Sequence, residues 1–298
     1  MVIGRLLDKV AAVRQQRSYR ATRSPERVAS IDPSSLLFHY GNIHSQRGQD
    51  GVLAEIFRRL GIAKGRFVEF GAWDGLYLCN SRWLYEKGWD GVFIEGVPKR
   101  YEKLKRVYAR DDRITAIQAF VGAPSHGVEG ETLSQILANA SVDPASIDFV
   151  SIDVDGPDLE IFLEMGISPA VVLLEGGFNF TPYLRGPVVR KAGDPNLQHG
   201  LDYITAQAAQ AGYELVCFYQ DSYLVRSSLF DRLELPRRTA VELYRDAINF
   251  MPQDYHAALI ELRAHSPLIR SAEQAQFGTF KADPLDPAYS GELPHRDD

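Results

Sequence analysis

The sequence predicts an α/β protein built on a seven-stranded, mostly parallel sheet with helices on both faces. Apolar strands alternate with helices from about residue 49 onward, which is the pattern of a doubly wound parallel sheet. The expected strands are almost continuously apolar, as strands are when helices cover both faces of a sheet. Near residue 221 two strands follow each other so closely that one of them has to run antiparallel to the rest.

The first half of the pattern opens with an amphipathic helix. Residues 49–61 place Val52, Leu53 and Ile56 on one face, and Gly61 ends the helix. Apolar runs then predict strands, and the segments between them predict helices, the second of which begins at a proline, a residue favoured in the first helical turn. In order, these are strand 66–72, a helix through Trp83, Leu84 and Tyr85, strand 91–96 and helix 98–110.

The second half continues the alternation and ends in a hairpin. Three short apolar runs bounded by turn signals predict strands at 113–121, 147–154 and 170–176. Helices are expected between them at 132–140 and 157–165. After a long loop we expect helix 199–211 and two strands, 213–220 and 222–228, separated by Asp221. This layout resembles the methyltransferase variant of the Rossmann architecture, and it accounts for residues 45–230.

The two ends of the chain lie outside this pattern. In residues 1–44, Ile3, Leu6, Leu7 and Val10 recur at helical spacing between basic residues, which predicts an amphipathic helix suited to packing on the protein's own body or forming a homodimer. Residues 17–35 are polar and are expected to be a linker. Residues 231–298 predict extra helices followed, from residue 281, by a loosely ordered tail.

Composition excludes several classes of function. A net charge of −6 over 298 residues argues against nucleic acid as a partner, because phosphate binding needs a basic surface. No run of about 18 apolar residues is present, so we expect no membrane span. The N-terminus shows no secretion signal, and the two cysteines suggest neither a metal site nor a redox pair. We therefore expect a cytoplasmic protein.

Two strand ends carry the first functional signal. In an open α/β sheet ligands bind beyond the carboxyl ends of the strands. The first strand ends in "VEFGAWDG", where Gly71 permits a tight turn, and the second ends at Glu95, whose carboxylate can accept hydrogen bonds from ribose hydroxyls. Trp73 and Asp74 stand where a dinucleotide fingerprint would have its second glycine. This arrangement favours a nucleoside over a pyrophosphate-containing cofactor.

Three segments give the sequence a family resemblance. "SQRGQDGVLAEIF" (45–57), "RFVEFGAWDGLYLCNSRWLYEKGWDGVFIEG" (66–96) and "DFVSIDVDGPDLEIF" (148–162) resemble the FkbM-like family of S-adenosylmethionine-dependent methyltransferases. The resemblance implies methyl transfer, commonly to a hydroxyl group of a sugar or secondary metabolite. It also implies that the cofactor is bound by Gln46, Glu69, Gly71, Ala72, Trp73, Asp74, Asn80, Ser81, Glu95, Gly96, Val97, Gln118, Ala119, Phe120 and Asp153. Within this set, Asn80 and Ser81 are expected to cap the helix beneath the site, and Gln46, with Ser45 and Gln49, to fold over the cofactor's carboxylate.

The stretch "DFVSIDVDGPD" (148–158) admits more than one function. Asp-x-Asp-Gly after a strand also occurs in haloacid-dehalogenase phosphatases, but Pro157 here replaces their usual Thr and three strand–helix units come first. On a fourth strand, Asp153 and Asp155 are candidates for the base that removes an acceptor's proton. Together with Glu175 they are also candidate ligands for Mg²⁺. Asp158 is expected only to stabilise the start of the following helix.

The loop 176–200 is long enough to be a lid over an acceptor site. Its aromatic and basic residues are of the kind that stack on a sugar ring and hold an acidic group. These are Phe178, Phe180, Tyr183, Arg185 and Arg190. His199, at the end of the loop, is a second candidate base.

The sequence therefore predicts a methyltransferase that acts on a small-molecule acceptor, a sugar, sugar nucleotide or secondary metabolite. Two alternatives remain open at this point. One is a nucleotide-dependent oxidoreductase of the Rossmann type, and the other is a methyltransferase-like domain that has lost activity and serves as a binding module.

Overall fold

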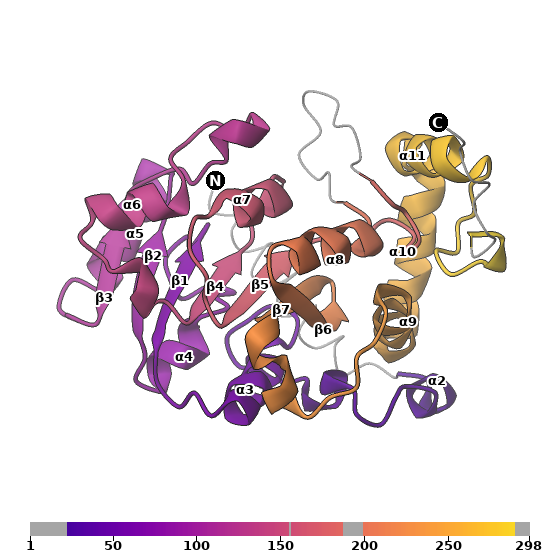
Figure 1. Ribbon diagram of the computed structural model, residues 1–298, viewed down its shortest axis with the longest axis horizontal. Helices are drawn as coiled ribbons and strands as arrows, with labels where there is room; N and C mark the ends of the chain where they lie inside the picture. Colours follow the sequence, from indigo (N-terminus) through magenta and orange to yellow (C-terminus); the bar gives the residue numbers. More distant parts are fainter. Residues whose placement is uncertain (1–22, 155, 187–198, 290–298) are drawn as a thin grey trace, which may run out of the picture.

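The computed structural model describes residues 23–154, 156–186 and 199–289 and contains one seven-stranded sheet (Figure 1). The strand order is β3-β2-β1-β4-β5-β7-β6. Neighbouring strands from β3 to β5 are parallel, whereas β7 runs antiparallel to both β5 and β6. This is the class I methyltransferase arrangement of the Rossmann-like α/β fold, as the sequence predicts.

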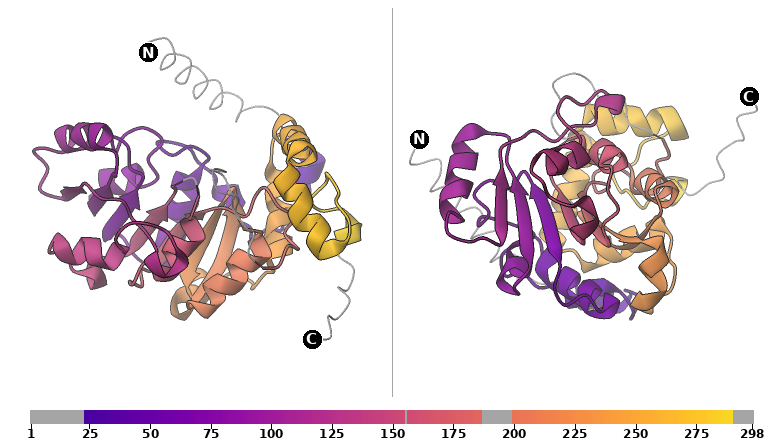
Figure 2. Two further views of the ribbon diagram at one scale, coloured as in Figure 1. Left: turned by 90° about the horizontal axis from the view of Figure 1, so that it is seen from above. Right: turned by 60° about the vertical axis from the view of Figure 1, so that its left-hand side comes forward.

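The strands are short and, apart from the edge strand β3, almost wholly buried, because helices lie on both sides of the sheet (Figure 2). Their core side chains are mainly Phe, Val, Ile and Leu. The strands are β1 (Arg66–Phe70), β2 (Asp90–Ile94), β3 (Ile114–Ile117), β4 (Phe149–Ile152), β5 (Val171–Glu175), β6 (Tyr213–Tyr219) and β7 (Asp221–Arg226).

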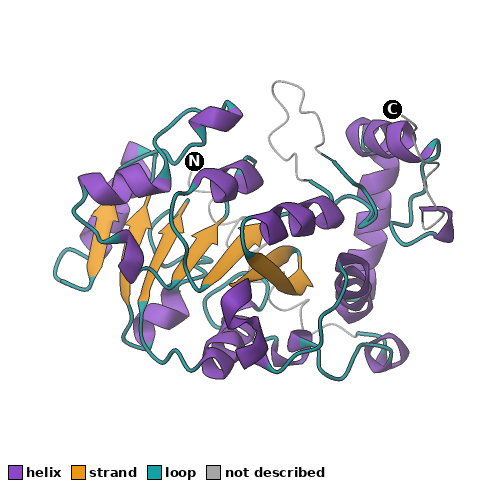
Figure 3. Ribbon diagram, viewed as in Figure 1, coloured by secondary structure: helices purple, strands orange, loops and turns teal. Residues whose placement is uncertain are grey.

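The helices between the strands follow the expected alternation (Figure 3). Gly61 ends the first of them in a left-handed conformation, at the position where the sequence predicts a stop. These helices are α3 (Gln49–Leu60), α4 (Arg82–Glu86), α5 (Pro98–Val107), α6 (Leu133–Asn139), α7 (Asp158–Glu164) and α8 (Leu201–Gln210).

All seven strands differ from their expected boundaries by one residue or more, and two of these differences concern residues of the site. Asp221 is not the break between the last two strands but the first residue of β7, and the turn is made by Gln220, whose φ is 63°. The third strand ends at Ile117, so Gln118, Ala119 and Phe120 follow the strand. In both places the backbone leaves the strand earlier than the apolar pattern suggests.

The segments outside the sheet are more ordered than the sequence indicates. The expected linker contains α2 (Pro25–Ala29), and the side chains of Arg23 and Arg27 donate hydrogen bonds to the carbonyls of Phe250 and Ile248 in the first C-terminal helix. The three C-terminal helices are α9 (Ala240–Phe250), α10 (Gln253–His265) and α11 (Pro267–Phe277). The amphipathic helix expected near the N-terminus, with its dimer interface, lies outside the described residues.

A buried ion pair holds the C-terminal helices together. Arg263 and Glu273, both fully buried, are 2.8 Å apart at their closest charged atoms. Tyr289, from the segment expected to be a loose tail, donates a hydrogen bond to Glu273 and is also buried. Such a pair contributes to stability only when both partners are present, because either charge left alone in the interior is costly.

In the part of the chain that the structure describes, no helix is both long enough and apolar enough to cross a membrane.

Candidate active site

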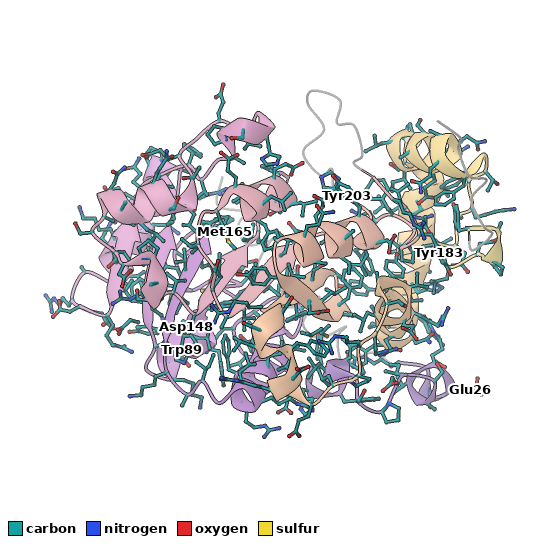
Figure 4. All side chains as sticks on the ribbon, in the orientation of Figure 1. Glu26, Trp89, Asp148, Met165, Tyr183 and Tyr203 are labelled. Carbon is teal, nitrogen blue, oxygen red and sulfur yellow. The ribbon has the colours of Figure 1, made fainter. Side chains whose placement is uncertain are left out.

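A cavity of about 970 Å³ opens beyond the carboxyl ends of the central strands. At the opposite edge of the sheet, Asp148 and Trp89 lie next to each other beside Gly65 (Figure 4). The cavity brings together many of the residues that the sequence assigns to a cofactor site. They are Gln46, Glu69, Gly71, Ala72, Trp73, Glu95, Gly96, Val97, Ala119, Phe120 and Asp153.

The turn after β1 requires the glycine that the sequence places there. Gly71 has a φ of 71°, and a Cβ atom on it would lie 2.5 Å from the backbone oxygen of Asp153. A side chain at this position would therefore clash with rigid backbone as well as strain its own. Trp73, two residues later, also has a positive φ, of 51°. Strain of this kind persists where the surrounding structure enforces it, often at functional sites.

Glu95 joins this turn to the segment after β2. One carboxylate oxygen accepts a hydrogen bond from the Trp73 backbone N–H at 2.9 Å, and the other accepts from the Val97 N–H at 2.8 Å. Glu95 is 3% exposed yet lines the cavity. A carboxylate has about four acceptor positions, so two backbone bonds leave capacity for a ligand's hydroxyl groups.

The wall next to Glu95 is apolar. Phe120 is 66% exposed, and its ring lies so close to Gly96 that a Cβ on this glycine would be 2.4 Å from a ring atom. On the other side, the guanidinium of Arg100 in α5 lies 4.3 Å from the centroid of the Trp73 ring. The exposed ring of Phe120 offers a flat apolar surface on which a nucleobase can stack.

Glu69 lines the cavity and also holds the next loop in place. Its carboxylate accepts hydrogen bonds from the backbone N–H groups of Asn80 and Ser81 and from the thiol of Cys79. Burial raises the pKa of Glu69, and these hydrogen bonds oppose the shift. The same loop is secured by a bond from the Asn80 side chain to Ser151. Glu69 thus fixes the start of α4, beneath the cavity.

Four of the expected cofactor residues are not in the cavity lining. Asp74 accepts hydrogen bonds from the N–H groups of Leu76 and Tyr77 and so shapes the turn. Ser81 occupies the N-cap of α4, but its side chain makes no capping bond, and Asn80 precedes it. Gln118 is exposed. These residues support the loops around the site, or lie beside it, instead of lining it.

At the other end of the cavity, three carboxyl groups stand on adjacent strands. Ile152 pairs with Leu174, so Asp153 and Glu175 follow at neighbouring positions of β4 and β5. Glu175 in turn pairs with Asp221 of β7. Because strands lie about 4.8 Å apart, the three carboxyls form a row across the edge of the sheet. We refer to Asp153, Glu175 and Asp221 as the acidic row.

The acidic row shares protons. The carboxyl groups of Glu175 and Asp153 are hydrogen-bonded to each other, which requires a proton on one of them. Burial, followed by the negative charges of Asp153 and Asp221, raises the pKa of Glu175 far above its usual value. Burial also raises the pKa of Asp221 to about 7, and Arg47 opposes this shift. Like charges this close in a buried setting do not all ionise together.

Asp158 has the structural role that the sequence suggests. Its carboxylate accepts hydrogen bonds from the backbone N–H groups of Val154 and Gly156 and so closes the loop before α7. Burial raises the pKa of Asp158 to about 7. Asp155, a candidate base and metal ligand in the same loop, lies outside the described residues.

The donor set does not fit magnesium. In residues 23–154, 156–186 and 199–289, no group of three or more His, Cys, Asp or Glu side chains is arranged to hold a metal ion. Two of the three candidate ligands, Asp153 and Glu175, form a hydrogen bond with each other. The described residues therefore give no basis for assigning a chemical step to a metal.

The described residues of the loop after β5, 176–186, and His199 do not line the cavity. Phe178 packs against Phe218 and Tyr244, and Phe180 is 1% exposed. Tyr183 lies beside the C-terminal helices (Figure 4). Arg185 pairs with Asp202 and His199 with Glu160, at 3.2 Å and 3.0 Å. These described side chains are absent from the cavity lining, and Arg190 lies outside the described residues.

Residues 43–47, directly before α3, form a loop that we call the arm. It carries Arg47, a residue to which the sequence assigns no role. Asp50 accepts hydrogen bonds from three successive backbone N–H groups, of Ile43, His44 and Ser45. This tight loop carries Gln46 and Arg47 into the cavity. The side chain of Gln49, which was expected over the cofactor, instead donates to Asp221 at 2.6 Å. The contact spans 172 residues of sequence, so no local pattern signals it.

Comparisons with known proteins give only weak similarity. No protein-family model and no curated protein matches the chain. A Staphylococcus aureus structure provisionally assigned as a caffeoyl-CoA O-methyltransferase is 12% identical, with 74% of this chain and 99% of that chain covered and a TM-score of 0.42. A Podospora anserina methyltransferase with bound S-adenosylhomocysteine is 14% identical, with 74% and 95% covered and a TM-score of 0.38. Similarity this weak carries no argument about activity. The fold assignment therefore rests on strand order, the FkbM-like resemblance stays a prediction, and function has to be argued from the site.

Proposed function

We propose that this protein is an S-adenosylmethionine-dependent methyltransferase that methylates a hydroxyl group of a sugar, sugar nucleotide or secondary metabolite. The observation that carries the proposal is Glu95. Its buried carboxylate lines a cavity at the end of β2 and is oriented by backbone bonds from both flanking loops. A carboxylate at this place in a Rossmann-like sheet is suited to ribose hydroxyls.

The residues present fit the cofactor. Gly71 and Gly96 let the Asp153 backbone oxygen and the Phe120 ring pack closely against the chain, and so shape the cavity wall. Glu95 would hold the ribose, and Phe120 with Gly96 and Val97 would flank the adenine. When bound, S-adenosylmethionine supplies a methyl group on a positively charged sulfur, which a nucleophile can attack.

The chain's own contribution is to align the acceptor and take up its proton. Asp153 lines the cavity directly after β4, beside the turn at Gly71. Its carboxylate is the group we assign to accept the proton of the acceptor hydroxyl. Glu175 adjoins it and holds the proton that the pair shares at rest. Base catalysis of this kind contributes about 10²- to 10⁴-fold, and alignment contributes further.

The first test compares ligands by isothermal titration calorimetry. S-adenosylhomocysteine should bind, and NAD should not, because Trp73 and Asp74 occupy the place of the glycine that a pyrophosphate needs. Glu95→Ala should weaken S-adenosylhomocysteine about tenfold or more, by loss of charge-assisted hydrogen bonds. Glu102→Ala, at an exposed position of α5, is the matched control. Binding of NAD in preference to S-adenosylhomocysteine would favour the oxidoreductase instead.

The second test asks for methyl transfer itself. Labelled S-adenosylmethionine is incubated with a panel of sugars, sugar nucleotides and hydroxylated metabolites, with and without a chelator. We expect a labelled product whose formation the chelator does not change. Cofactor binding without transfer to any acceptor, combined with unchanged cellular function of Glu95→Ala, would favour a non-catalytic binding module.

A further inference from the structure

Building on the proposed function, we propose that Arg47 binds the carboxylate of the cofactor's methionine part. The arm that carries Arg47 would then form a carboxylate subsite at the end of the cavity remote from Glu95. Neither the sequence pattern nor the resemblance assigns a role to this residue.

Strand order places Arg47 at that remote end. Glu95 follows β2, and its side of the cavity is completed by Phe120 after β3. Arg47 lies close enough to Asp221 to influence its charge, and Asp221 begins β7. In the sheet, β2 and β7 are separated by β1, β4 and β5. An elongated ligand with its ribose at Glu95 and its chain running past Gly71 therefore extends toward Arg47.

The arm is built to hold the backbone of Arg47 in place. The backbone N–H of Arg47 donates to the Gln49 side-chain oxygen at 2.6 Å, while the Gln49 amide donates to Asp221. The Asp50 carboxylate gathers three N–H groups of the same loop, and His44 pairs with Glu86 of α4 at 2.9 Å. Binding to a pre-organised group costs less ordering entropy than binding to a mobile one.

The charges of the cavity make the assignment specific. Among the lining residues that the structure describes, the basic side chains are Arg47 and Arg100. Arg100 lies over the Trp73 ring at the start of α5, directly beyond β2, and therefore serves the adenosine end. The other end is bordered by Asp153, whose negative charge repels a carboxylate, and by Glu175. An α-carboxylate there needs a cation, and a guanidinium pairs with it through two parallel hydrogen bonds.

The test uses two commercially available ligands that differ at this end. S-adenosylhomocysteine carries the carboxylate, and 5′-methylthioadenosine lacks the entire amino-acid group. Affinities of both are measured by calorimetry for the wild-type protein, Arg47→Gln, Arg47→Lys and the matched control Arg100→Gln. Thermal unfolding checks that each variant is folded.

We expect Arg47→Gln to weaken S-adenosylhomocysteine about ten- to hundredfold and to change 5′-methylthioadenosine by less than about threefold. Arg47→Lys should fall between, since it keeps the charge but loses the planar fork. Arg100→Gln should affect the two ligands alike. Equal weakening of both ligands by Arg47→Gln, or no weakening, would overturn the inference.

A further variant separates this role from simple neutralisation of Asp221. If Arg47 served only to balance that carboxyl, Arg47→Gln combined with Asp221→Asn would recover the affinity for S-adenosylhomocysteine. We expect no recovery, and a recovered affinity would overturn the inference. Failure of the wild-type protein to bind either ligand would instead contradict the proposed function, so the two outcomes are distinguishable.

Discussion

The two ends of the cavity are built in different ways. At the adenosine end, Glu95 is fixed by the backbone N–H groups of Trp73 and Val97, 22 and two residues away. At the acidic row, Asp153, Glu175 and Asp221 come from three strands and meet only because the sheet aligns them. The first end is therefore set by local turns, and the second by strand order. Under the proposed function, the first end would select a ligand by shape and hydrogen bonds, whereas the second would accept a proton.

The largest effect that would test this division is on catalysis. Asp153→Asn should lower the rate of methyl transfer about 10²- to 10⁴-fold, because the acceptor's proton loses its base. The affinity for S-adenosylhomocysteine should change by less than about threefold. Asp153 contacts Gly71 through its backbone oxygen, which the substitution leaves unchanged. Rates are measured with the acceptor that the labelled panel identifies, and affinities by calorimetry.

Glu175→Gln is the matched variant for this prediction. Glutamine has the shape of a protonated glutamic acid and can still donate a hydrogen bond to Asp153. The variant should therefore retain activity within about tenfold of wild type, because it imitates the proton that Glu175 holds at rest. If both variants were equally inactive, the division of roles within the pair would be wrong.

The same contrast explains how far the sequence could predict the site. Gly71 and Glu95 were identified because each ends an apolar strand, and strand ends are visible in a single sequence. Asp221 was taken for the break in a hairpin, although it begins β7 and faces Glu175. Asp221 lies beside Glu175 because β7 is inserted next to β5. No local pattern in the sequence predicts this pairing. Arg47 was missed for the same reason, since its arm is anchored to Asp221 through Gln49.

Two aromatic residues of the loop after β5 have a different role from the one that the sequence predicts, for a related reason, whereas the lid itself stays a prediction. Composition shows that Phe178 and Phe180 are aromatic, but it does not show which surface they cover. The backbone of this segment is bonded to the C-terminal extension: Thr181 donates to Glu273, and Arg263 donates to the carbonyl of Asn179. The aromatic rings consequently serve the core and not an acceptor.

The acidic row should also make stability depend on pH. Asp221 has its pKa raised to about 7 by burial, with Asp153 reinforcing and Arg47 opposing the shift. Between about pH 4 and 7 the folded protein then binds more protons than the unfolded chain, so stability falls as the pH rises through this window. A shift of this size corresponds to a few kcal/mol, roughly 1.4 for each pKa unit.

Asp221→Asn should remove part of this dependence. The asparagine oxygen can still accept the bond from Gln49, so the loss of charge is the main change. We expect the variant to be more stable than wild type at pH 8 and to show a smaller decline between pH 4 and 7, measured by urea denaturation. Asp112→Asn, at an exposed position, is the control and should leave the pH profile unchanged. An identical profile for Asp221→Asn and wild type would contradict this account.

The smallest expected effect is a difference in the free energy of unfolding between alanine variants of two glycines at the adenosine end. Gly71→Ala places a Cβ against the rigid backbone oxygen of Asp153 at a φ of 71°, and strain at such a position costs about 1–3 kcal/mol. Gly96→Ala meets only the ring of Phe120, which is 66% exposed and can move aside. We therefore expect urea denaturation to show clear destabilisation for Gly71→Ala and a change below about 1 kcal/mol for Gly96→Ala.

Gly96→Ala, although it hardly changes stability, should change the affinity for the ligand. In Gly96→Ala the displaced Phe120 ring no longer offers its flat surface to the nucleobase, so S-adenosylhomocysteine should bind several times more weakly even though the fold is intact. Phe120→Ala should reproduce this loss, because it removes the same ring without touching Gly96. If Gly96→Ala weakened binding while Phe120→Ala did not, the ring would not be part of the nucleobase site, and the apolar wall would have to be assigned to Val97 and Ala119 instead.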